Sequence, residues 1–200
     1  MDRRTAIKLA VAAPLAGAFS WTGVDADQAR RAAATARAAA AASGQAYAPT
    51  FFTDHEWQTI RVLVDMIIPA DERSGSATAA GVPEFMDFMM TDQPNRQVPM
   101  RGGLAWIDVE CRKRFDRSFV DCDPAQRAQL LDDIAWPKRA RPELSHGVAF
   151  FNSFRDLTAT GFWSSKVGVE DLQYTGNQFV AEWNGCPEPA LRRFGVSYSD

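Results

Sequence analysis

The sequence is poor in the residues from which most catalytic and metal sites are built. Among its 200 residues are only two histidines, His55 and His146, and three cysteines, Cys111, Cys122 and Cys186. These residues form no C-x-x-C or C-x-x-C-H motif, and neither histidine has a second at metal-ligand spacing. No P-loop or strand-linked G-x-G-x-x-G is present. We therefore expect this chain to hold no catalytic residue, no cofactor-binding residue and no metal ligand.

The sequence also lacks a basic excess and a membrane-spanning apolar run. Its 22 Lys and Arg residues against 25 Asp and Glu residues give a net charge of -3, which offers no electrostatic case for nucleic-acid binding. The apolar run over residues 9–18 is about half as long as the roughly twenty residues that a membrane-spanning helix needs. With 46% hydrophobic residues, the chain can nevertheless fold around a core.

Residues 1–18 have the three parts of an export signal. Arg3, Arg4 and Lys8 form a charged segment, residues 9–18 form a short apolar segment, and the last three residues suit a signal peptidase. The paired arginines resemble a twin-arginine signal, which directs folded cargo to its exporter, and an ordinary secretory peptide is the alternative. Because folded export suits cofactor proteins, the chain either binds an unrecognised group or escorts a partner that carries one.

Residues 19–50 are rich in alanine. They have high helix propensity but no stripe of large apolar side chains. We expect a linker or a frayed helix, and the functional alternative is a helix that lies along a partner.

Residues 51–200 predict an all-α domain of about five helices, with an irregular aromatic-rich C-terminal arm from about residue 162. The pair Gly102-Gly103 is interpreted as a turn that opens the third helix. The other helix boundaries are predicted from capping residues, prolines and one glycine: Thr53 with Glu56, Pro69, Pro83, Asp123 with Pro124, and Gly161.

The C-terminal arm combines turn residues with aromatic side chains that must be covered. Without helical or strand periodicity, residues 162–187 predict a loop, yet free loops seldom carry so many aromatics. Either the chain's own helices or a partner covers them. Under the partner hypothesis, Trp163, Tyr174 and Trp183 lie at the interface.

The odd number of cysteines leaves at least one without an internal partner. Thiols of exported proteins tend to be oxidised. Cys111 and Cys122 are the default internal pair, although Cys111 can also be a plain core residue. Cys186 follows the aromatic arm and is better placed for a bridge to another chain.

An ordered series of short motifs resembles the gluconate 2-dehydrogenase subunit 3 family, the small or gamma subunit of such dehydrogenases. No single motif is diagnostic, and the resemblance rests on their order. The motifs are Phe52-Thr53-x-x-Glu56, Ile67-Ile68-Pro69-Ala70-Asp71, Ala80-Gly81-Val82-Pro83-Glu84-Phe85, Gly103-Leu104-Ala105-Trp106, Phe162-Trp163-Ser164-Ser165, Tyr174-x-Gly176-Asn177 and Gly185-Cys186.

The resemblance implies a non-catalytic subunit of a periplasmic sugar or sugar-acid dehydrogenase. In such complexes a large flavoprotein of the glucose-methanol-choline class carries FAD, and a multihaem cytochrome c often passes electrons to quinone. The small subunit is thought to carry the twin-arginine signal for the large subunit and to support its maturation and stability. It is then periplasmic and meets the membrane through the complex. Where the family often has tyrosine, this chain has Trp163.

Two other functions are consistent with the residues alone. An independent periplasmic enzyme would build its site from His55, Asp71, Glu72 and the arm. A structural scaffold protein would have no dehydrogenase partner.

Overall fold

The computed structural model describes residues 23–173, 181–182 and 184–198, and over these residues the chain is helical and contains no strand. The predicted all-α class is confirmed. The α-helices are α2 (Gly23–Ser43), α3 (Asp54–Ile67), α4 (Ala77–Ala80), α5 (Val82–Asp92), α6 (Gln97–Phe115), α7 (Pro124–Ala135), α8 (Ser145–Ser164), α9 (Lys166–Asp171) and α10 (Glu188–Phe194), and three short 3-10 turns are η1 (Pro94–Arg96), η2 (Phe119–Asp121) and η3 (Pro142–Leu144).

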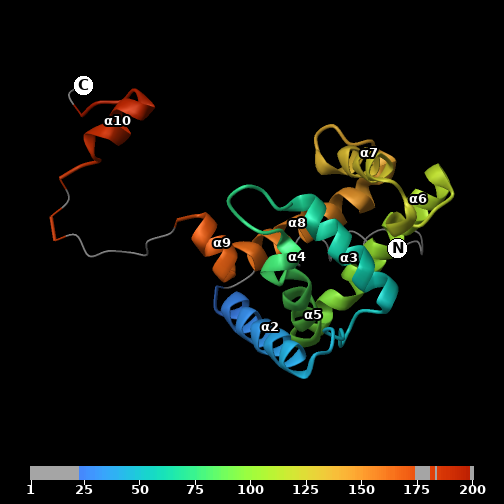
Figure 1. The fold of residues 1–200 in the computed structure, drawn as a ribbon. Helices are drawn as coiled ribbons and strands as arrows, with labels where there is room; N and C mark the ends of the chain where they lie inside the picture. The colour runs from blue at the N-terminus through green and yellow to red at the C-terminus, as the bar shows by residue number, and fades with distance from the viewer. Residues whose placement is uncertain (1–22, 174–180, 183, 199–200) are drawn as a thin grey trace, which may run out of the picture.

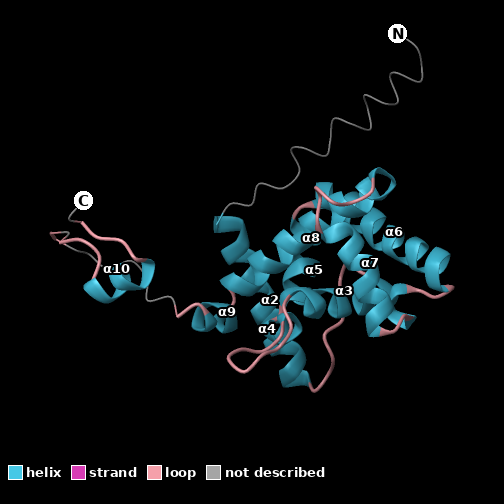
Figure 2. Cartoon of the chain, turned by 90° about the horizontal axis from the view of Figure 1, so that it is seen from above, coloured by secondary structure: helices cyan, strands magenta, loops and turns pink. Residues whose placement is uncertain are grey.

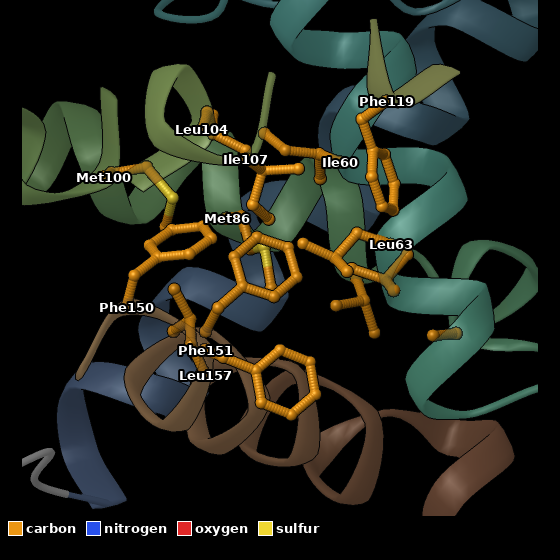
Figure 3. Close-up of a cluster of buried hydrophobic side chains, with 14 of the residues drawn as sticks. Ile60, Leu63, Met86, Met100, Leu104, Ile107, Phe119, Phe150, Phe151 and Leu157 are labelled. Carbon is orange, nitrogen blue, oxygen red and sulfur yellow. The ribbon is translucent and has the colours of Figure 1, made fainter. Parts of the chain in front are cut away.

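Helix α8 is the centre of the body and contacts each helix from α2 to α7 as well as α9 (Figure 1). Its inward face carries Phe154, Leu157 and Phe162, which are almost fully buried. Figure 3 shows side chains from α3, α5, α6 and α8 converging on one core, with Leu63 and Met86 near its middle. Burial of these apolar side chains is the main force that holds the helices together.

Two of the predicted helix starts are confirmed at atomic detail. The Thr53 hydroxyl accepts the backbone N–H of Glu56, whose carboxylate accepts the N–H of Thr53 in return. Asp123 and Gln126 form the same reciprocal pair at the start of α7. Such capping boxes satisfy backbone donors that a helix start otherwise leaves without partners.

Two glycine predictions are wrong. Gly102-Gly103 does not open a helix but lies inside α6, and Gly161 does not close α8, which continues to Ser164. At Gly103 and Gly161 the missing Cβ makes room for an aromatic ring of a neighbouring helix, Phe150 and Phe85 respectively. The glycines therefore serve close packing between helices, which a reading of local turn signals does not detect.

Helical structure continues past residue 162, where the sequence predicted the start of an irregular arm. Residues 162–164 complete α8, and α9 follows after a single break at Ser165. Phe162, placed in the arm by the sequence, is fully buried in the core.

The alanine-rich segment forms helix α2, which packs along α5 and α8 (Figures 1 and 2). Ala26, Ala29 and Ala33 are buried at helical spacing. Small side chains let two helix backbones approach closely, so this face contributes packing without large apolar residues.

Candidate partner-binding surface

The predicted interface residue Trp163 lies where α8 meets α9, in a segment of residues 162–172 that we call the α8–α9 elbow. Its ring packs edge-on against Phe162, with ring centroids 4.9 Å apart, and is 39% exposed. Val169 and Leu172 of the same elbow are also exposed. The elbow thus presents one large aromatic and two aliphatic side chains to solvent, a composition that favours protein contacts.

The elbow is held in shape by Ser165 and Gly168. The Ser165 hydroxyl donates to the Phe162 carbonyl at 2.7 Å and accepts the Gly168 N–H at 3.0 Å, so it ends α8 and caps α9. A side chain at Gly168 would collide with the backbone of Phe162 and Trp163. This turn therefore holds Trp163 in one orientation, with part of its side chain exposed to solvent.

A second support comes from the loop after α3. The Arg73 guanidinium donates to the Asp171 carbonyl at 2.5 Å and forms an ion pair with the Asp171 carboxylate at 3.4 Å. Asp71 shapes this loop by accepting the backbone N–H groups of Arg73 and Ser74, each at 2.8 Å. These hydrogen bonds, from Ser74 first and then Arg73, lower the pKa of Asp71.

The C-terminal segment around α10 lies apart from the helical body in both views (Figures 1 and 2). It folds on itself, because the Cys186 N–H donates to the Tyr198 hydroxyl at 2.8 Å and Gly185 lies against the Tyr198 ring. No residue of α10 is buried, and Phe194, Val196 and Tyr198 are strongly exposed. Cys186 is an exposed thiol at the base of this unit. The predicted contacts Tyr174 and Trp183 lie outside the described residues.

A groove of about 290 Å³ opens between α6 and α8. Its lining is mainly apolar and includes Met90, Met100, Trp106, Phe150, Phe154 and Leu157. His146 and Ser153 lie on its wall with Arg96. Such a lining suits an apolar group more than a charged substrate.

The family model described as gluconate 2-dehydrogenase subunit 3 matches residues 54–184, well over half of the chain. The chain belongs to the gluconate 2-dehydrogenase subunit 3 family. No curated protein and no solved structure matches it. In this subunit 3 protein the matched interval begins at the first residue of α3 and includes the elbow, whereas α2, Cys186 and α10 lie outside it.

The residues proposed for an independent enzyme are not brought together in this subunit 3 protein. His55 lies at the start of α3, and Asp71 and Glu72 follow its end, so the length of the helix, about 20 Å, separates them. The His55 imidazole instead bonds to the Asp108 carboxylate of α6 at 2.5 Å. Asp108 also accepts the Phe119 N–H at 2.9 Å, which gives it a role in joining α3, α6 and η2.

Within the part of the chain that the structure describes, no group of three or more His, Cys, Asp or Glu side chains could hold a metal ion. None of the helices described there is both long and apolar enough to cross a membrane. The residues that sequence reasoning missed are Arg73, Asp171 and Ser165, which position the elbow. No local pattern predicts the pairing of Arg73 with Asp171, because these residues are 98 positions apart in the sequence.

Proposed function

We propose that this subunit 3 protein is the non-catalytic small subunit of a periplasmic flavin-dependent sugar or sugar-acid dehydrogenase. It exports, matures and stabilises a large subunit of the glucose-methanol-choline class that carries FAD. In the assembled complex a multihaem cytochrome c takes the electrons, and the complex associates with the membrane. The observation that carries the proposal is the family match over residues 54–184.

The surface of the chain supports a role in binding another protein. Exposed apolar side chains gather at the elbow and in the C-terminal unit, at Trp163, Leu172 and Phe194. Such side chains at an interface exclude water and supply most of the binding free energy. We place Trp163 and Cys186 at the contact with the large subunit, together with Tyr174 and Trp183.

The export role predicts that replacing Arg3 and Arg4 by lysine in the full chain retains both subunits in the cytoplasm. Lysine keeps the positive charge that an ordinary secretory signal needs, but not the arginine pair of a twin-arginine signal. Both subunits are co-expressed, and dehydrogenase activity and each chain are measured in the periplasmic fraction. A flavoprotein that still reaches the periplasm in full amount contradicts the escort role.

The interface proposal predicts that Trp163→Ala weakens binding of the purified large subunit about tenfold or more, the loss typical of an aromatic interface residue. Affinity is measured by calorimetry or surface binding. Trp136→Ala is the matched control, since Trp136 is 61% exposed and directly follows α7. Helix α7 lies away from α9 in Figure 1.

Equal affinities of the two variants would show that the elbow is not the contact. Thermal melting of each variant alone separates lost binding from lost folding. A non-reducing gel of the wild-type complex and its Cys186→Ser counterpart reports whether Cys186 bridges the two chains.

A further inference from the structure

Cys111 and Cys122 lie side by side in the core. Cys111 is on the inner face of α6 and Cys122 follows η2, and they are 0% and 2% exposed. Both are free thiols, and Cys122 lies close enough to Cys111 to contribute to the raised pKa of the Cys111 thiol. Two neighbouring cysteines in one core cluster are the first requirement for a disulfide.

The turn that carries Cys122 is held against α6 by a hydrogen bond and by burial of Phe119. The Asp108 carboxylate, one turn before Cys111, accepts the backbone N–H of Phe119 at 2.9 Å. Phe119 itself is fully buried, and the Cys122 N–H donates to the Ser118 carbonyl at 3.1 Å. These contacts hold the turn against the helix independently of the thiols.

The far side of the same turn is fixed to α7. The Arg127 guanidinium donates to the Phe119 carbonyl at 3.0 Å and to the Val120 carbonyl at 2.7 Å. Because the turn is held from both sides, Cys122 keeps one position relative to Cys111 in the folded chain. A covalent bond there would join α6 to the start of α7.

We propose that Cys111 and Cys122 form an intrachain disulfide when the chain meets a disulfide oxidant. One cysteine, as thiolate, attacks a sulfur of the oxidant and forms a mixed disulfide, releasing the first oxidant thiol. The second cysteine then attacks its neighbour's sulfur, which forms the Cys111–Cys122 bond and releases the second oxidant thiol. The chain loses two electrons and two protons, and the oxidant, a small or protein disulfide, gains them.

The reaction is slow in the folded chain. Burial, and then the neighbouring Cys122, raise the pKa of Cys111 to about 12, so very little thiolate exists at neutral pH. Both sulfurs are also shielded from an oxidant. Oxidation therefore occurs during folding or after local opening of residues 116–122, and low denaturant accelerates it.

The test uses the full chain with Cys186→Ser, so that only the two buried thiols remain. The reduced protein is incubated with oxidised glutathione, with and without low denaturant, then denatured and alkylated. Peptide mapping by mass spectrometry is expected to find the Cys111 and Cys122 peptides linked and no alkylated cysteine. The melting temperature of the oxidised protein should exceed that of the reduced protein by about 5 to 10 °C.

The matched control carries Cys122→Ala as well as Cys186→Ser and should show no oxidant-dependent rise in melting temperature. Two alkylated cysteines after incubation in low denaturant, or two glutathione adducts in place of a link, overturn the proposal. The oxidised and reduced forms of the Cys186→Ser protein are compared with each other. The result therefore does not depend on whether the control folds well. Since neither export nor a partner is needed, this proposal stands or fails separately from the proposed function.

Discussion

Replacing Gly103 by alanine is expected to lower the free energy of unfolding by about 2 to 3 kcal/mol, through overpacking of a close helix contact. The added methyl group would overlap the ring of Phe150, which is buried between α6 and α8. The adjacent Gly102 has open space around its Cβ position and is exposed. There the same substitution should stabilise α6 by about 0.5 to 1 kcal/mol, the difference in helix propensity between glycine and alanine.

Helices α6 and α8 interlock, because each has a glycine against which an aromatic ring of the other helix packs. Gly103 of α6 receives the ring of Phe150 from α8, and Gly147 of α8 receives the ring of Trp106 from α6. Gly147→Ala should therefore also destabilise the chain. Because both rings line the groove, a ring pushed away from either glycine changes the shape of that groove as well.

Urea unfolding of Gly102→Ala and Gly103→Ala measures the free energy of unfolding of each variant. Equal dependence of the two free energies on urea concentration would show that both variants expose the same amount of surface on unfolding. If both substitutions stabilise the chain, the Phe150 ring moves into the groove at little cost. The interlock would then not be what holds α6 against α8.

This pair of glycines also shows what the sequence can and cannot predict about the fold. Capping boxes are local, since Thr53 and Glu56 interact within one turn, and the sequence predicted them correctly. Gly103 matters only because Phe150, far along the chain, packs on it. Without the tertiary contact, two glycines are more typical of a turn than of a helix interior.

The sequence did not predict that α2 packs on the helical body, for a related reason. The search for an amphipathic helix looks for large apolar residues, whereas α2 buries a stripe of alanines. The polar contacts of α2 also join residues far apart in the sequence. Arg37 donates to the Ala79 carbonyl at 3.2 Å and lies 3.6 Å from the Glu84 carboxylate. Burial raises the pKa of Glu84, and the nearby Arg37 charge opposes that rise.

The candidate surface was predictable only in part. An unusually aromatic segment pointed to Trp163, which is exposed at the elbow. The residues that fix the elbow could not be predicted, because Arg73 and Asp171 are brought together only by the packing of the intervening helices. His55 was weighed as a catalytic residue, but in the structure it is paired with Asp108.

The second large effect is expected at Asp87, a carboxylate of α5 that is 1% exposed. Its oxygens accept the Tyr47 hydroxyl at 2.8 Å and the backbone N–H groups of Thr50, Phe51 and Phe52 at 2.7, 2.9 and 3.3 Å. Burial and the bond to Asp87 raise the pKa of Tyr47, so the phenol remains a donor at physiological pH. One side chain thus accepts four hydrogen bonds from the connection between α2 and α3.

Asp87→Ala should lower the free energy of unfolding by about 3 to 5 kcal/mol, because three backbone donors and a hydroxyl lose their acceptor together. Tyr47→Phe removes only one of these bonds and should cost about 1 kcal/mol. Asp92→Ala, at the exposed end of the same helix, should change the stability by less than about 0.5 kcal/mol.

Urea unfolding gives the three free energies, and limited proteolysis of residues 44–52 reports whether the connection has come loose. If Asp87→Ala costs no more than Tyr47→Phe, water satisfies the freed N–H groups and the segment is held by apolar contacts alone. A large loss of stability together with rapid cleavage would instead mean that α2 stays on the body through Asp87. In that case the short polar stretch between two helices, and not the alanine face, sets how firmly the N-terminal helix is attached.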